Sequence, residues 1–327
     1  MAPLGAAYGL VAARRMRQAG FRSPLPVLCV GNLVVGGAGK TPTAMAVAQR
    51  LIASGQRPWF LSRGYGSAAE HGPPIAVDPD RDFAQDVGDE ALLLARVAPT
   101  LVSADRIAAA RLAAARGASI LILDDGLQNP ALEKDLRLVV VDAGAGIGNG
   151  LCLPAGPLRA PLAGQLDFMS ALLVVGEGAQ GARLADCARR FGKPVIGARL
   201  VIAADRAAGL ANRRVYAFAG IGRPAKFFET LAEVGARIVG TASFPDHYAY
   251  RRDDIAPLQR AAKAQDALLV TTEKDFVRLR PCDAMLDRAL PAPTPIPIEM
   301  SFSDAGLLDD LLEHFLAQAV RRTPGKL

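Results

Sequence analysis

The stretch Pro26–Thr41, PVLCVGNLVVGGAGKT, joins an apolar run to a glycine-rich segment and a Lys-Thr pair. Pro26–Val30 predicts a short buried strand, and Thr41–Ser54 predicts a helix. Glycines between a strand and a helix let backbone N–H groups approach phosphate oxygens, and the helix N-terminus favours anions. We therefore predict that this loop binds a nucleoside triphosphate through the following residues: Gly36, Gly37, Ala38, Gly39, Lys40 and Thr41.

Each polar residue of the loop has an expected role. Lys40 is predicted to contact the β- and γ-phosphates, and the Thr41 hydroxyl to bind Mg²⁺. The pattern G-x-x-x-x-G-K-[ST] has glycine where this chain has Val34. A glycine-rich surface turn with a solvated lysine is the alternative, but strand, glycines, Lys-Thr pair and helix all coincide here.

Two acids are candidates for ordering the metal ion. Asp124 and Asp125 follow the apolar run Ser119–Leu123, at the carboxyl end of a predicted strand, where ligands of parallel sheets collect. We predict that both bind Mg²⁺ or its waters, and that Asp125 and Lys40 belong to the catalytic group. A turn is the alternative, because Asp-Gly is a strong turn signal.

Apolar runs and helical segments alternate along the chain, which predicts an α/β fold with a doubly wound, mostly parallel sheet of the P-loop NTPase type. Further buried strands are expected at Trp59–Leu61, Ser119–Leu123, Leu138–Val141, Ala171–Val175 and Val195–Ile202. Ala203–Arg214 lacks periodicity and is a candidate linker, after which Val215–Ala219, Lys226–Val234, Ala267–Thr271 and Pro295–Met300 continue the alternation. The expected organisation is an N-terminal helix over residues 1–22, a core over 23–205 and a smaller α/β domain over 206–327.

The composition of the chain argues against several classes of protein. The chain has 327 residues, 51% hydrophobic and 21% charged, with a mean hydropathy of +0.20, which excludes general disorder. A net charge of +6 favours anionic partners, unless it reflects genome composition alone. No basic run with interleaved aromatics is present, so no nucleic-acid partner is expected. The cysteines Cys29, Cys152, Cys187 and Cys282 lie far apart, which argues against disulfides and zinc and favours a reducing compartment.

The N-terminus combines an apolar segment with basic residues. Leu4–Ala13 is apolar apart from Tyr8, and Arg14, Arg15, Arg17 and Arg22 follow. A bilayer span needs roughly 20 apolar residues, and a secretory signal has its charges first. Two interpretations stay open: an amphipathic helix lying in a membrane interface, or a helix packed on its own domain with a solvated basic face.

Several peptides resemble the tetraacyldisaccharide 4′-kinases of lipid A biosynthesis. They are Cys29–Thr41 (CVGNLVVGGAGKT), Leu61–Gly66 (LSRGYG), Val87–Glu90 (VGDE), Ser103–Arg106 (SADR), Leu123–Gln128 (LDDGLQ), Leu153–Arg159 (LPAGPLR), Phe244–Tyr248 (FPDHY) and Thr271–Asp275 (TTEKD). The resemblance implies transfer of the ATP γ-phosphate to the 4′-hydroxyl of a tetraacylated glucosamine disaccharide 1-phosphate. It also implies a peripheral enzyme on the cytoplasmic face of a Gram-negative inner membrane, with no obligate protein partner evident. The core over 23–205 is then a P-loop kinase domain, whose family loop lacks a glycine at the position of Val34.

The resemblance also assigns residues. Asp89 matches the family's catalytic aspartate, the candidate general base, and His247 matches the histidine paired with it. From the residues alone, Asp89 could equally cap a helix and His247 could be an ordinary loop residue. Candidate substrate-binding residues are Arg63, Tyr65, Glu90, Arg106, Asn129 and Arg159. Many relatives have His at the position of Asn129, whose amide can hydrogen-bond but cannot carry a charge.

Two other classes of function compete with a lipid kinase. A P-loop GTPase or metallochaperone is disfavoured because N-K-x-D is absent and the sequence has no His/Cys metal cluster. In Thr272–Asp275 (TEKD) the lysine comes one place late, so ATP is the expected nucleotide. A membrane-associated ATPase of the partitioning type would explain the loop and the basic N-terminus. It would give Asp89, His247 and the second domain no role.

Overall fold

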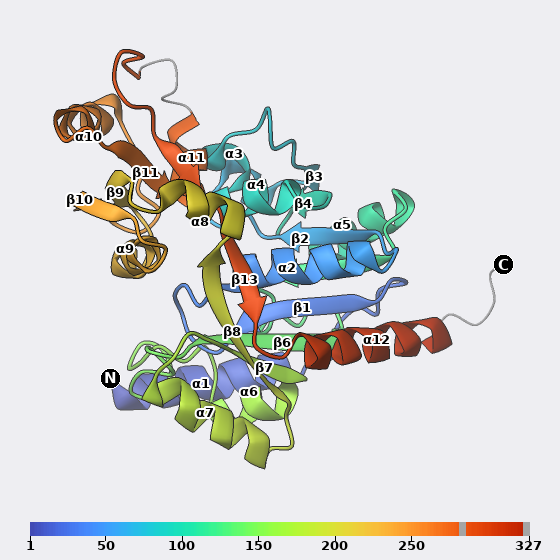
Figure 1. Ribbon diagram of the computed structural model, residues 1–327. Helices are drawn as coiled ribbons and strands as arrows, with labels where there is room; N and C mark the ends of the chain where they lie inside the picture. The colour runs from blue at the N-terminus through green and yellow to red at the C-terminus, as the bar shows by residue number, and fades with distance from the viewer. Residues whose placement is uncertain (281–285, 323–327) are drawn as a thin grey trace.

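The computed structural model describes residues 1–280 and 286–322, and Cys282 lies outside these ranges. Within them, strands form one large and one small sheet (Figure 1). The large sheet contains β1 (Val27–Asn32), β2 (Pro58–Ser62), β3 (Ile75–Ala76), β4 (Thr100–Val102), β5 (Ile120–Asp124), β6 (Leu136–Asp142), β7 (Ala171–Val175), β8 (Val195–Ile202) and β13 (Ile298–Phe302). The small sheet contains β9 (Arg214–Ala219), β10 (Arg237–Ser243), β11 (Leu268–Thr272) and β12 (Thr294–Ile296).

Helices connect most of these strands. In chain order they are α1 (Ala2–Met16), α2 (Lys40–Ala53), the 3₁₀ turn η1 (Ala68–His71), α3 (Ala84–Val87), α4 (Asp89–Ala95), α5 (Arg106–Ala115), α6 (Leu162–Phe168), α7 (Ala179–Arg190), α8 (Ala204–Leu210), α9 (Pro224–Glu233), α10 (Arg252–Ala264), α11 (Glu273–Leu279) and α12 (Ala305–Arg322).

The large sheet has the order β13-β8-β7-β6-β1-β5-β2-β4-β3, in which β3 and β13 are antiparallel to their neighbours and the other pairs are parallel. Every residue of the central strand β1 is buried, as expected for a strand covered on both faces. The predicted doubly wound, mostly parallel α/β sheet is confirmed. The carboxyl ends of β1, β5 and β6 lie side by side, which places their following loops at one edge.

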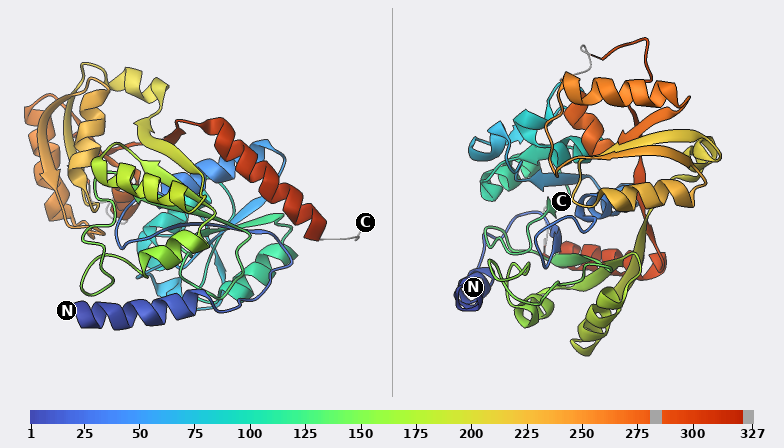
Figure 2. Two further views of the ribbon diagram at one scale, coloured as in Figure 1. Left: turned by 90° about the horizontal axis from the view of Figure 1, so that it is seen from below. Right: turned by 90° about the vertical axis from the view of Figure 1, so that its left-hand side faces the viewer.

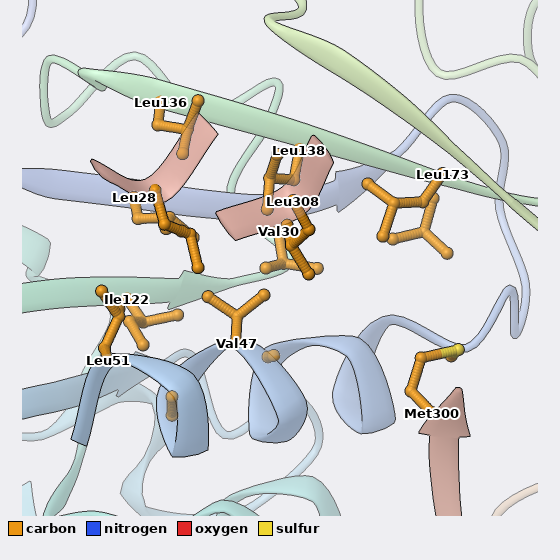
Figure 3. Packing of buried hydrophobic residues seen from close by; sticks show 14 of the residues in the cluster. Leu28, Val30, Val47, Leu51, Ile122, Leu136, Leu138, Leu173, Met300 and Leu308 are labelled. Carbon is orange, nitrogen blue, oxygen red and sulfur yellow. The ribbon is translucent and has the colours of Figure 1, made fainter. Parts of the chain in front are cut away.

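Two hydrophobic cores occupy the two faces of the large sheet. On one face, Leu28 and Val30 of β1 pack with Val47 of α2 and with Leu308 of α12 (Figure 3). On the other face, side chains of β1 and β6 pack with α5, α6 and α7. Because successive residues of a strand point to opposite faces, one apolar run supplies both cores.

The small sheet has the order β10-β9-β11-β12 with all strands parallel. It packs with α9 and α10, and it lies beside the α3–α4 end of the large sheet (Figure 1). Helix α11 leaves this sheet and contacts α4, so the two sheets meet along α4 and α11.

Three expectations about the second half need correction. The candidate linker Ala203–Arg214 contains α8, whose Leu210 is buried in the core of the small sheet. The expected single strand Pro295–Met300 is two strands separated by Pro297, which lacks a backbone N–H donor. β12 belongs to the small sheet, whereas β13 pairs with β8 of the large one. The range 206–327 therefore does not form one domain, because β13 and α12 pack on the large sheet.

Candidate active site

The loop between β1 and α2 has the backbone that close approach to phosphate requires. Gly36 and Gly39 have φ angles of 113° and 87°, in the left-handed region that L side chains rarely adopt. Lys40 begins α2, and its ammonium lies 3.3 Å from the carbonyl oxygen of Gly36 and 3.6 Å from a carboxylate oxygen of Asp125. The Asn32 amide donates to the same carbonyl at 3.1 Å. The loop is thus fixed by the strand before it and the helix after it.

Asp124 ends β5 beside this loop. The Thr41 hydroxyl donates to Oδ2 of Asp124 at 3.1 Å, and within the described ranges the buried Oδ1 has no hydrogen-bond partner. Burial raises the pKa of Asp124 to about 6, and the negative charge of Asp125 adds to this, although Lys40 and Thr41 oppose it. A divalent cation would stabilise the ionised form of such a carboxylate. A hydroxyl, a carboxylate and an unpartnered carboxylate oxygen fit Mg²⁺, which prefers oxygen ligands.

Asp125 is held in a different way. Its φ angle is 56°, a left-handed conformation that aspartate tolerates better than most residues. Arg159 donates two parallel hydrogen bonds of 3.0 Å to its carboxylate and a third, of 3.2 Å, to the carbonyl oxygen of Val34. Arg159 therefore lies against the nucleotide loop. Arg63 lies elsewhere, paired with Glu70 at 2.7 Å and more than half exposed.

Asp89 and His247 are in contact. Asp89 is the first residue of α4, directly after Gly88, and is only 5% exposed. Its Oδ2 lies 3.3 Å from Nδ1 of His247. Two residues of α11 approach the same oxygen: Arg278 donates to it from Nε at 2.8 Å and also from Nη2, and the Lys274 ammonium lies at 4.0 Å.

The charges of this cluster are coupled. Burial acts to raise the pKa of Asp89, but hydrogen bonds with Glu90 and His247 and the charges of Lys274 and Arg278 outweigh it and hold that pKa well below its usual value. Burial and the shared hydrogen bond with Asp89 raise the pKa of Glu90 to about 7, even though Lys274 lies 2.6 Å away. The hydrogen bond to Asp89 raises the pKa of His247. The charge of Lys274 also opposes the raised pKa of Asp124, the carboxylate that accepts from Thr41.

His247 occupies a strained position. Its φ angle is 57°, again in the left-handed region, where non-glycine residues are uncommon. Such conformations persist where the surrounding structure holds them, and they concentrate at functional sites. The side chain is half exposed, so the imidazole joins a buried carboxylate to solvent.

The remaining predicted substrate residues are dispersed. Tyr65 is 80% exposed on the loop after β2, and Glu90 pairs with Lys274. Arg106 opens α5 and is 4% exposed, and within the described chain its Nη1 has no partner. Burial lowers its pKa to about 10, while Asp124 and Asp125 act in the opposite direction. Asn129 accepts a hydrogen bond from the Ala131 N–H, as a turn residue does.

Sequence reasoning did not select Lys274 or Arg278. Lys274 lies in a peptide of the resemblance, and Arg278 comes one helical turn later, so both point from the same face of α11. Asp275 between them is fully buried and accepts hydrogen bonds from Gly220 N–H, Tyr250 and Thr272. An acid engaged in this way is not placed to read a guanine base, so the resemblance of this peptide to N-K-x-D has no functional meaning.

The site combines a glycine-rich loop on a parallel sheet, two acids next to that loop, and a carboxylate–histidine pair approached by Lys274. Together these features define a P-loop phosphotransferase. A family model described as tetraacyldisaccharide-1-P 4′-kinase matches residues 1–317. The chain belongs to this family.

Curated relatives agree with the family match. Tetraacyldisaccharide 4′-kinases from Methylobacterium sp. (strain 4-46) and Methylobacterium nodulans are 53% and 54% identical to this chain, cover 94% of it, and are themselves covered to 90% and 89%. One from Bradyrhizobium sp. (strain BTAi1) is 48% identical over 99% of this chain and 93% of its own length. A crystal structure of LpxK from Aquifex aeolicus, in complex with ATP, superposes with a TM-score of 0.72 at 25% identity, covering 96% of this chain and 97% of that one.

Proposed function

We propose that the chain transfers the γ-phosphate of ATP to the 4′-hydroxyl of tetraacyldisaccharide 1-phosphate, with Asp89 accepting the hydroxyl proton and His247 assisting. The contact between Asp89 and His247 carries this proposal. The alternative of Asp89 as a helix cap has less support, since Gly88 occupies the N-cap position and, among the described backbone N–H groups, the Asp89 side chain accepts that of the next residue, Glu90, at 3.0 Å.

The nucleotide side of the reaction rests on the loop. Its backbone N–H groups and Lys40 would neutralise the β- and γ-phosphates of ATP. Thr41 and Asp124 would hold Mg²⁺, with Asp125 beside them. When bound, this ion would neutralise charge developing on the phosphate oxygens. Arg159 is held at the loop by Asp125 and Val34, and one further N–H on each of Nη1 and Nη2 would donate to a phosphate oxygen.

The acceptor side rests on Asp89 in its ionised form. The low pKa of Asp89 keeps the carboxylate charged throughout the physiological range, which a proton acceptor requires. A weak base is sufficient, because phosphoryl transfer through a loose transition state needs little proton removal before the phosphate bond forms. The half-exposed His247 can then pass the proton to solvent. Arg63 and Tyr65, exposed on the loop after β2, are proposed to face the acceptor.

The reaction is tested with γ-labelled ATP, Mg²⁺ and tetraacyldisaccharide 1-phosphate in mixed micelles, following labelled lipid by chromatography. Asp89→Asn should lower turnover by roughly 10²–10⁴-fold, the usual contribution of a general base, without weakening ATP binding. His247→Asn should lower it less. His71→Asn is the matched control, since His71 is exposed and outside the cluster. Near-normal transfer by Asp89→Asn would refute the base, and phosphate release without labelled lipid would favour a membrane ATPase.

We also propose that α1 attaches the enzyme to the surface of the inner membrane, on its cytoplasmic face. Gly5 and Gly9 pack α1 closely on the loop around Cys152, which leaves Leu4, Leu10 and Val11 exposed. Figure 2 shows α1 on the outside of the molecule, away from the small sheet. An apolar exposed face next to arginines suits the interface of an anionic membrane. Among the described residues, no helix has the length and apolar composition needed to cross a bilayer.

A further inference from the structure

Arg278 connects the two sheets through a single guanidinium. Its side chain is 6% exposed. From α11 it donates to Asp89 of α4 through Nε and Nη2, and through Nη1 to the carbonyl oxygen of Gly220 at 2.7 Å and to Asp275 at 3.2 Å. Gly220 directly follows β9 of the small sheet, so the fork joins the end of that sheet to the first turn of α4.

Asp275 fixes the orientation of this fork. It is fully buried and accepts hydrogen bonds from the Gly220 N–H at 3.0 Å, the Tyr250 hydroxyl at 2.8 Å and the Thr272 hydroxyl at 2.6 Å. These donors hold the carboxylate in one position, and the carboxylate in turn holds Nη1 of Arg278. Guanidinium is planar, so fixing Nη1 also fixes the direction of Nε and Nη2.

We propose that Arg278 is a positioning residue for phosphoryl transfer, which aims the Asp89 carboxylate at the acceptor hydroxyl and keeps it ionised. The inference rests on the proposed role of Asp89. Arg278, His247 and Lys274 all approach Oδ2, whereas Oδ1 accepts the N–H of Glu90 at 3.0 Å. A carboxylate oxygen can accept two hydrogen bonds, so Oδ1 has the capacity to accept one from the acceptor hydroxyl as well.

A docking role is the alternative, since any arginine between two packed parts can hold them together. Arg280 provides the matched control. It lies two residues further along the chain and donates to the carbonyl oxygens of Pro79 and Asp80, on the large-sheet side, without reaching Asp89. Arg280→Gln therefore removes contacts between the same two parts and leaves the carboxylate untouched.

The test compares Arg278→Gln, Arg278→Lys and Arg280→Gln in the full chain, with turnover and kcat/KM for the lipid acceptor measured across pH and ATP affinity measured separately. Arg278→Gln should lower kcat about 10²-fold, the usual cost of misplacing a catalytic group. It should also move the acid limb of kcat/KM upward by about one pH unit, because a cation next to a carboxylate lowers its pKa. His247, Lys274 and Glu90 still face Asp89 in this variant, so the limb does not move further.

Arg278→Lys separates orientation from charge. Lysine keeps the positive charge but cannot reach Asp89, Gly220 and Asp275 together. We expect a reduced kcat with the acid limb within about 0.3 units of wild type, and this variant carries the test if Arg278→Gln does not fold. ATP affinity should stay within about twofold in all three variants, and Arg280→Gln should keep wild-type kcat and pH profile.

Two results would overturn the proposal. One is an equal loss of kcat in Arg280→Gln and Arg278→Gln, which would make both residues docking contacts. The other is a wild-type kcat and acid limb in a folded Arg278 variant. If Asp89→Asn is inactive in either case, the proposed base survives while the role of Arg278 fails; if Asp89→Asn is active, the base itself fails.

Discussion

Replacing Leu308 by alanine tests the finding that α12 belongs to the large sheet. Leu308 is fully buried with Leu28 and Val30 of β1, the strand that leads to the nucleotide loop, and with Leu138 of β6 (Figure 3). Leu→Ala changes in cores cost about 2–5 kcal/mol, from lost transfer free energy and the remaining cavity. With an unfolding entropy of about 2.1 cal/mol/K per residue, a loss of about 3 kcal/mol lowers the midpoint of this chain by about 4 °C.

The assay is thermal unfolding followed by circular dichroism, with Glu313→Ala as the control. Glu313 lies on the exposed side of the same helix, so its replacement keeps the helix and removes no buried surface. We expect the control to stay within about 0.5 kcal/mol of wild type. A Leu308→Ala midpoint equal to that of Glu313→Ala would refute the packing of α12 on the large sheet.

Two other predictions concern the exposed apolar face of α1 and the ion pairs of Asp142. Replacing both Leu10 and Val11 by Glu should weaken binding to anionic vesicles by more than about tenfold, since each buried apolar side chain contributes about 1.5–3 kcal/mol. A flotation assay measures this binding, with Ile52→Glu, at an exposed site on α2, as the control. Unchanged binding of the double variant would exclude α1 from the membrane contact. Asp142→Asn should cost about 1–2 kcal/mol at pH 7, because Asp142 binds Lys226 at 2.9 Å and also Arg223, both on the small-sheet side. Burial acts to raise the pKa of Asp142, but the hydrogen bonds and charges of these partners and the Ala145 N–H lower it overall. The ionised form is therefore the stabilising one, and the difference between variant and wild type in urea unfolding should disappear as the pH falls through that lowered pKa; a constant difference would contradict it.

Local patterns were sufficient for much of the large sheet. Pro26–Val30, Ala171–Val175 and Val195–Ile202 are apolar runs, and the structure has β1, β7 and β8 there, with the β1 bounds shifted by one or two residues. The sequence did not indicate β10, because this edge strand (RIVGTAS) is only partly buried and has no continuous apolar run. It also did not indicate the change of sheet at Pro297, because a strand's residues do not show which neighbour it will pair with.

The sequence also predicted only part of the candidate site. The nucleotide loop could be recognised because glycines, Lys40 and Thr41 are adjacent in the chain, and their φ angles and the start of a helix are local properties. Asp89 and His247 could be selected only by resemblance, and the structure brings them into contact while their roles stay proposals.

By itself, the sequence determined the class of fold, the position of the phosphate loop and the family, since each depends on neighbouring residues. Only the tertiary structure decided that Arg278, one arginine among many, would be buried against Asp89, and that the chain would return through β13 and α12 to the large sheet. The physical reason is that a buried charge is stable only with a partner, and an apolar sheet face is stable only when other elements bury it. Residues distant in the chain supply both once folding brings them together.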